Sequence, residues 1–134
     1  MSKPKLHFGH PISTYGTTIE QKLIEIIEEH FPEYELDNCN QSHHQKAAKK
    51  LREETGNPME YFFKEFIPKM SVGVFLPYRD GMFGSGVYDE AVQMHQERKP
   101  IYQIDYKGVI FEMRLNNSKR LSIPETKARN KVSE

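Results

Sequence analysis

The sequence predicts an α/β fold, with a Rossmann- or flavodoxin-like, mostly parallel sheet of about five strands, flanking helices and a C-terminal antiparallel edge strand. Apolar runs typical of strands alternate with amphipathic helical patterns over roughly the first hundred residues. The run at residues 72–76 has the character of a buried strand, and a glycine-containing turn and a helical pattern follow it. The last two expected strands are separated by too few residues for a parallel crossover, so they must pair antiparallel.

The N-terminal part begins with a short strand at residues 5–8, which ends at Gly9. A loop rich in turn-forming and hydroxyl residues follows, up to residue 16. Thr17 and Glu20 have the spacing of a capping box, and apolar residues then recur at helical spacing until Pro32. Residues 34–37 form a weaker strand candidate.

The later elements follow the same alternation, and one domain is expected over residues 1–115, with a polar C-terminal tail over residues 116–134. A short helix within that tail is expected at residues 123–129, and residues 105–108 have the composition of a hairpin turn. The remaining expected elements are helices at residues 47–54, 59–67 and 86–98 and strands at residues 72–76, 101–104 and 109–115.

Composition excludes several classes of protein. The 134 residues include 19 basic and 19 acidic side chains, and this balance argues against binding to a nucleic-acid polymer. No apolar run approaches the ~20 residues of a membrane span, and the N-terminus has no apolar signal region, so we expect a cytoplasmic protein without a membrane partner. Cys39 is the one cysteine, which excludes an internal disulfide. The apolar helix faces near residues 19–31 and 59–67, together with the neutral charge, predict a homo-oligomer.

The segment from Phe83 to Glu90 is the strongest candidate for chemistry. Gly84 and Gly86 allow a sharp turn and a close approach of the backbone to a ligand. Glu90 lies about one turn inside the following helix, where a carboxylate can act as a nucleophile or can merely complement the helix dipole.

Two loops are expected at the carboxyl ends of the strands, where open parallel sheets bind their ligands. In the first loop, Ser13, Thr14 and Thr17 stand at a helix N-terminus, so they are suited either to binding a 5′-phosphate or, for Thr17, simply to capping the helix. His10 is either a turn residue or, like Asp80 and Tyr78, a group that assists a leaving nucleobase.

Three short motifs carry a resemblance to a known family. They are the Gly-His-Pro-Ile-Ser loop at residues 9–13, the Ser-Gly-Val-x-x-Glu turn at residues 85–90, and the Lys-Pro pair at residues 99–100. In this order the chain resembles the nucleoside 2-deoxyribosyltransferase superfamily, including its 5′-monophosphate N-glycosidase branch. The resemblance implies that Glu90 is the nucleophile at the anomeric carbon and that Asp80 binds the sugar or handles a proton. The chain departs from the family pattern at His10-Pro11, where small residues are usual, and at Asp89 beside Glu90.

Residues and resemblance together predict an N-glycosidase or deoxyribosyltransferase that cleaves the N-glycosidic bond of a nucleoside or nucleotide. The alternative is a non-catalytic module of the same fold that binds or senses a nucleotide-derived ligand. No cofactor is expected, and no metal, since His43 and His44 lack a completing set of ligands. One pocket with an accessible Glu90 should hold the catalytic residues Glu90 and Asp80 and the substrate-binding residues Gly9, His10, Ser13, Thr14, Tyr78, Ser85 and Gly86.

Overall fold

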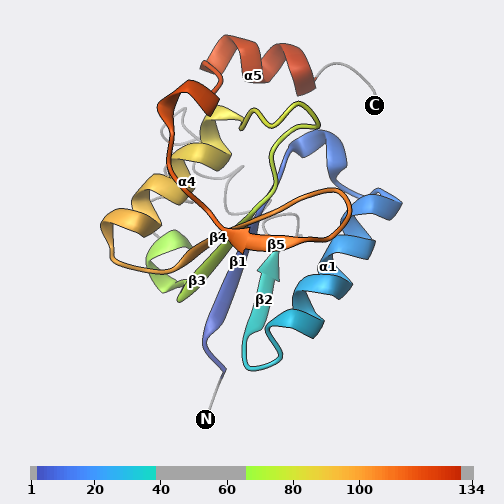
Figure 1. Ribbon diagram of the computed structural model, residues 1–134, viewed down its shortest axis with the longest axis vertical. Coiled ribbons are helices and arrows are strands. Elements are labelled where there is room, and N and C mark those ends of the chain that lie inside the picture. The colour runs from blue at the N-terminus through green and yellow to red at the C-terminus, as the bar shows by residue number, and fades with distance from the viewer. Residues whose placement is uncertain (1–2, 39–65, 131–134) are drawn as a thin grey trace, which may run out of the picture.

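The chain forms an α/β structure around one five-stranded mixed sheet with the strand order β2-β1-β3-β4-β5. The computed structural model describes residues 3–38 and 66–130 (Figure 1). Strands β1 to β4 run parallel and β5 runs antiparallel to β4, so the prediction of a mostly parallel sheet with an antiparallel C-terminal strand is confirmed. The strands are β1 (Lys5–Gly9), β2 (Glu35–Asn38), β3 (Val72–Phe75), β4 (Ile101–Ile104) and β5 (Ile110–Glu112).

Helices cover both faces of the sheet (Figure 1). Thr17 caps the first helix as predicted, because its hydroxyl oxygen accepts the Glu20 N–H at 3.2 Å, and the helix ends before Pro32. The α-helices of the described residues are α1 (Thr18–His30), α4 (Ser85–Gln96) and α5 (Ile123–Asn130), and the short 3-10 turns are η1 (Ile12–Thr14), η3 (Ile67–Lys69) and η4 (Asn117–Lys119).

The alternation of side chains along β1 and β3 divides the core into two halves. Leu6 and Phe8 of β1 and Val72 and Val74 of β3 pack with the apolar face of α1. Phe75, on the opposite face, belongs to the second cluster, whose α4 members are Tyr88, Ala91 and Met94. The sheet is therefore buried on both faces, as expected for parallel strands.

Two glycines allow α4 and the β3 side chains to lie close to the sheet. A Cβ atom at Gly73 would come within 2.5 Å of the Phe75 ring and 2.8 Å of Met94 Sδ. A Cβ atom at Gly9 would come within 2.8 Å of the same ring and 3.1 Å of His7 Nε2. The space that side chains would fill at these positions is thus used by Phe75, Met94 and His7.

The β4–β5 hairpin forms where the sequence predicts it. Asp105 Oδ1 accepts the backbone N–H groups of Lys107 and Val109 at 2.9 and 3.0 Å, and Gly108 supplies a φ of 91°. β5 is shorter than the predicted strand at residues 109–115. The Met113 N–H still donates to the Ile101 carbonyl at 3.1 Å, and the chain then runs toward the loop before α4, where Arg120 forms a bridge with Phe83.

The segment after residue 116, predicted as a polar tail, lies against the sheet domain. The Phe83 N–H donates to the Lys119 carbonyl at 2.7 Å, and the Leu121 N–H donates to the Phe83 carbonyl at 2.9 Å. Leu121 is buried, and α5 follows it in agreement with the short helix predicted at residues 123–129.

Several predictions fall outside the described residues: the helix at 47–54, most of the helix at 59–67, Cys39, His43 and His44.

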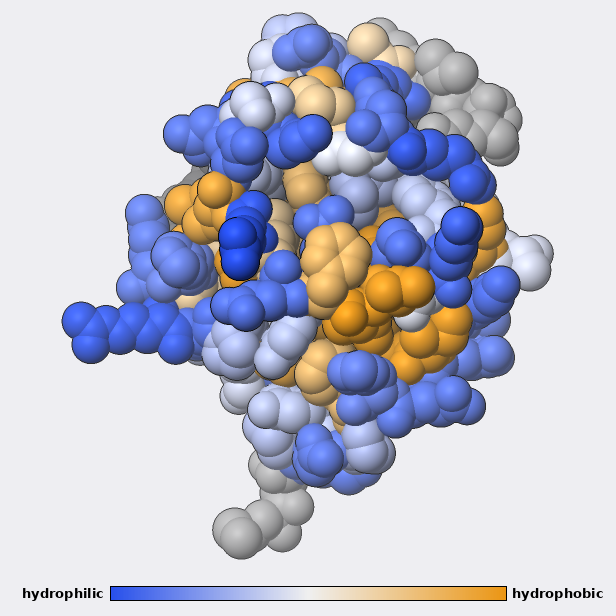
Figure 2. All heavy atoms as spheres, in the orientation of Figure 1, coloured by the Kyte–Doolittle hydropathy of each residue, from blue (hydrophilic) through white to orange (hydrophobic). Residues whose placement is uncertain are grey.

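Within the described part of the chain, no helix has both the length and the apolar character needed to cross a membrane. Most of the surface seen in Figure 2 is hydrophilic, with apolar side chains gathered near its centre. The large apolar side chains with the highest exposure include Val109 and Phe111 of the hairpin.

We expect Gly73→Ala to lower the free energy of unfolding by about 1–3 kcal/mol, because the added methyl group meets the buried Phe75 ring and Met94. Chemical denaturation monitored by circular dichroism measures this cost. The exposed neighbour Ser71 provides the control, since Ser71→Ala should stay within about 0.5 kcal/mol of the unchanged protein. Equal stabilities for the two variants would contradict the close packing at Gly73.

Candidate functional site

The loops after β1 and β3 diverge at the point where the strand order reverses. β1 lies between β2 and β3; its loop leads to α1 on one face, and the loop after β3 leads to α4 on the other. The two loops start side by side, since the Leu76 N–H donates to the Gly9 carbonyl at 2.9 Å. In open parallel sheets such a divergence is the usual place for a ligand.

A histidine–glutamate pair lies beneath this point, on the α4 side of the sheet. His7 Nε2 of β1 is 3.1 Å from Glu90 Oε1 of α4. The His7 side chain is fully buried, and 6% of the Glu90 side chain is exposed. Phe66 and Phe75 pack edge-on against the imidazole, with ring centroids 5.0 and 5.6 Å away. The contact is therefore made in apolar surroundings, where a hydrogen bond to a carboxylate is strong.

The surroundings of His7 indicate which ring nitrogen carries the proton. His7 Nδ1 is buried and has no hydrogen-bond partner among the described residues. A proton on Nδ1 would be a buried donor without an acceptor, whereas a proton on Nε2 is donated directly to the Glu90 carboxylate. The geometry thus favours the tautomer with Nε2–H.

The two oxygens of Glu90 are not equivalent. Oε1 contacts His7, while Oε2 has no hydrogen-bond partner among the described residues. Among the described residues, the side-chain polar atoms that are both fully buried and without a hydrogen-bond partner are His7 Nδ1 and Ser13 Oγ, and Oε2 is not among them. Oε2 therefore belongs to the small part of the side chain that solvent reaches. Glu90 was expected to be accessible, but only the Oε2 side of its carboxylate reaches solvent. The close packing of α4 on the sheet brings the rest of the carboxylate against His7.

A second buried pair lies on the α1 side of the same strand. His10 Nε2 is 3.2 Å from Glu20 Oε2, and Glu20 Oε1 accepts the Gly16 N–H at 3.0 Å. The other ring nitrogen of His10 lies 3.0 Å from the Thr14 hydroxyl, which donates to the Pro11 carbonyl. His10 and Thr14, both predicted to bind substrate, thus fasten the first loop to α1.

Asp80 and Tyr78 lie together in the second loop, beside α5. Asp80 Oδ2 accepts a hydrogen bond from Arg129 at 2.7 Å, and the same guanidinium lies over the Tyr78 ring. The hydrogen bond from Arg129, helped by the Met82 N–H, lowers the pKa of Asp80 below its ordinary value of 3.8. Asp80 is consequently ionised at neutral pH and is not suited to donating a proton there.

The remaining predicted residues are Ser85 and Gly86, in the first turn of α4, and Ser13, in η1. The Ser85 N–H donates to the Thr126 hydroxyl oxygen at 2.9 Å, so a residue of α5 caps α4. Ser85 is buried and Gly86 is half-buried. Asp89 does not join the Glu90 site, because it forms a two-point ion pair with Arg120 at 2.8 and 2.9 Å.

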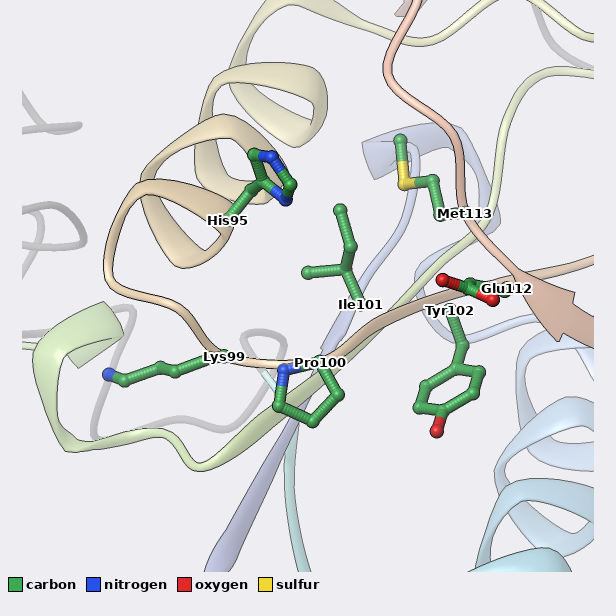
Figure 3. Close-up of a pocket in the computed structure, with 7 residues that line it drawn as sticks. All are labelled: His95, Lys99, Pro100, Ile101, Tyr102, Glu112 and Met113. Carbon is green, nitrogen blue, oxygen red and sulfur yellow. The ribbon is translucent and has the colours of Figure 1, made fainter.

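The predicted residues thus form separate groups around the switch point: His10 with Thr14, Asp80 with Tyr78, and Glu90 near Gly9. A hollow of about 330 Å³ lies at the opposite, amino-terminal end of β4 (Figure 3). Lys99 in this hollow already contacts Glu97 and the carbonyls of Ile67 and Pro68, so its charge is satisfied by the fold. The lining residues are His95, Lys99, Pro100, Ile101, Tyr102, Glu112 and Met113.

His7 and Glu20 were not among the predicted site residues. The two-residue period of β1 places His7 on the face opposite Leu6 and Phe8, and this was the available signal for His7. Glu20 was assigned only to the capping box of α1. Its contact with His10 depends on how the loop folds back over the helix, which local spacing does not encode.

The described residues contain no group of three or more His, Cys, Asp or Glu side chains that could hold a metal ion. In comparisons with protein-family models, curated proteins and solved structures, no match to this chain is found.

Removing the Glu90 carboxylate should destabilise the fold. Glu90→Ala leaves the buried Nε2–H of His7 without an acceptor and opens a cavity, so we expect a loss of about 2–4 kcal/mol in the free energy of unfolding. Glu90→Gln keeps an acceptor oxygen, and its expected cost is smaller, about 1 kcal/mol. The control is Glu28→Ala on the exposed face of α1, and a Glu90→Ala protein as stable as this control would contradict the buried contact.

The Asp80–Arg129 pair should depend on pH in one direction. Because the pKa of Asp80 is lowered in the folded state, the pair stabilises the protein above pH 3.8 and loses this contribution as the pH falls further. Carboxyl-carbon NMR titration should show the pKa of Asp80 rising toward 3.8 in Arg129→Gln. Lys127→Gln, on the same helix, should leave the titration unchanged, and an unchanged Asp80 titration in Arg129→Gln would contradict the pair.

Proposed function

We propose that the chain is an N-glycosidase or deoxyribosyltransferase that cleaves the N-glycosidic bond of a nucleoside or nucleotide with Glu90 as nucleophile. The observation that carries the proposal is the state of the Glu90 carboxylate. One oxygen lies 3.1 Å from His7 Nε2, and the other has no partner among the described residues. This is the arrangement that a carboxylate nucleophile needs, because one oxygen is oriented and the other is free to react.

The fold and the sequence support the same position. The strand order is that of flavodoxin-like sheets, which bind ligands between the loops at the switch point, here the loops after β1 and β3. Glu90 lies on the helix that follows the second of these loops. The Ser-Gly-Val-x-x-Glu spacing at residues 85–90 is the motif that resembles the nucleoside 2-deoxyribosyltransferase superfamily.

In the proposed reaction, Glu90 Oε2 attacks the anomeric carbon as the bond to the base nitrogen breaks. The base leaves with the bonding electrons and takes a proton, and the sugar becomes esterified to Glu90. Water then attacks the anomeric carbon in a hydrolase, or a second base does so in a transferase, and the carboxylate is regenerated. In the ester, Oε1 becomes the carbonyl oxygen and can keep its hydrogen bond from His7.

Of the two roles that the resemblance implies for Asp80, the proposal keeps sugar binding and omits donation of a proton. Since Arg129 keeps its carboxylate ionised, Asp80 acts in this proposal as an anion that orients Arg129 or a sugar hydroxyl. The proton for the leaving base then comes from another group or from water.

Burial of the Glu90 side chain favours one alternative, a non-catalytic module that binds a nucleotide-derived ligand in the same crevice. In that case, the His7–Glu90 pair only holds α4 on the sheet. The two proposals differ in a single observable, the release of a free base.

The test is chromatographic detection of base release from nucleosides, nucleoside monophosphates and NAD. We expect Glu90→Gln to lower the turnover by orders of magnitude while ligand affinity stays within about tenfold, because the amide keeps the shape but is not a nucleophile. Glu20→Gln is the matched control, since Glu20 is equally buried and paired with a histidine on the other face. Full base release by Glu90→Gln would contradict the role of Glu90 as nucleophile, and ligand binding without base release by the unchanged protein would support the binding module.

A further inference from the structure

The C-terminal helix α5 lies at the end of the molecule where the loops after β1 and β3 begin, close to the start of α4 (Figure 1). It contacts α4, which follows the β3 loop, and η1, which lies in the β1 loop. Thr126 accepts the Ser85 N–H at 2.9 Å, and Arg129 pairs with Asp80 at 2.7 Å. A single helix thus bridges the two loops that diverge at the switch point.

The residues just before α5 are firmly attached. The Phe83 and Leu121 N–H groups donate to the carbonyls of Lys119 and Phe83, and Leu121 is buried. Arg120 forms its two-point ion pair with Asp89, and the Tyr88 hydroxyl donates to Asn117 Oδ1 at 3.2 Å. This segment, residues 117–121, is called the anchor below.

The helix beyond the anchor is held much more weakly. None of the side chains at residues 123–129 is buried, and Ile123 is 57% exposed. The Arg129–Asp80 pair is exposed on both sides, and such pairs contribute little to stability. α5 also has its own capping box between Ser122 and Glu125, so it keeps its N-terminal cap when it moves.

The contact with α4 is of a kind that a ligand can replace. Gly84 occupies the N-cap position of α4 and has no side chain to offer, so the Ser85 N–H depends on the Thr126 hydroxyl. When α5 moves away, this N–H is free for an acceptor oxygen of a bound molecule.

We propose that α5 is a lid that opens about a hinge at Ser122 while the anchor stays in place, and that opening uncovers the N-terminal turn of α4, the helix that carries Glu90. The identity of the ligand that enters when the lid opens, a nucleoside or nucleotide, rests on the proposed function, whereas the opening itself does not. Lid opening is local unfolding of contacts that bury little surface, so it should occur far more often than global unfolding.

Hydrogen exchange measured by NMR on the full chain tests this without a substrate, so the lid and the glycosidase proposal can fail separately. The Ser85 amide reports on the lid, because its acceptor is the Thr126 hydroxyl oxygen, and the Phe83 and Leu121 amides report on the anchor. We expect the Ser85 amide to be protected at least about tenfold less than the two anchor amides.

Variants sharpen the result. Arg129→Gln should lower protection of the Ser85 amide by about two- to fivefold and leave the anchor amides unchanged, because it removes the ion pair with Asp80 while the Thr126 hydroxyl stays in place. Lys127→Gln loses the same charge on the same helix without touching Asp80, and it should exchange like the unchanged protein. Equal protection of lid and anchor amides, or a variant that affects both alike, would overturn the proposal.

Discussion

The contact between His7 and Glu90 ties β1, an interior strand of the sheet, to α4. It forms in surroundings made by Phe66 and Phe75, where an unpaired carboxylate or imidazole N–H would be costly. For the carboxylate to reach the strand, α4 must lie close to the sheet, and the absence of a side chain at Gly73 allows this. The rotation of α4 about its axis is then fixed, and with it the direction in which the helix N-terminus points.

That placement determines how the two loops at the switch point are held. The N-terminus of α4 has a glycine at the cap position, so it depends on Thr126 from α5. On the other face, His10 and Glu20 hold the β1 loop against α1. Each histidine therefore fastens β1 or its loop to a different helix, and the space between the two loops is covered by α5. The two buried histidine–glutamate pairs and α5 together determine which side chains lie at the switch point.

The strands of the sheet and their directions could be predicted from the sequence because they depend on local patterns. Apolar runs, the Thr17 cap and the short Asp105–Gly108 turn locate strands, α1 and the hairpin. The site was less accessible because its contacts join residues far apart in the chain. Glu90 was recognised from its motif, but its partner lies 83 positions away. The alternation along β1 places His7 on the α4 face without identifying Glu90 as its partner. Likewise, the polar composition after residue 116 indicated a tail and concealed that Arg120, Thr126 and Arg129 each bind a group in the β3 loop or in the first turns of α4.

The central claim is that His7 donates its Nε2–H to Glu90 and thereby holds one carboxylate oxygen. Nitrogen-15 NMR of the histidine side chains measures the position of this proton directly, and the His7→Gln protein identifies the His7 signals by their loss. At neutral pH we expect Nε2 of His7 to carry the proton and Nδ1 to have the shift of an unprotonated nitrogen, because Nδ1 has no acceptor among the described residues. A neutral His7 ring with its single proton on Nδ1 would contradict the claim, since its Nε2 would then have no proton to donate to the carboxylate.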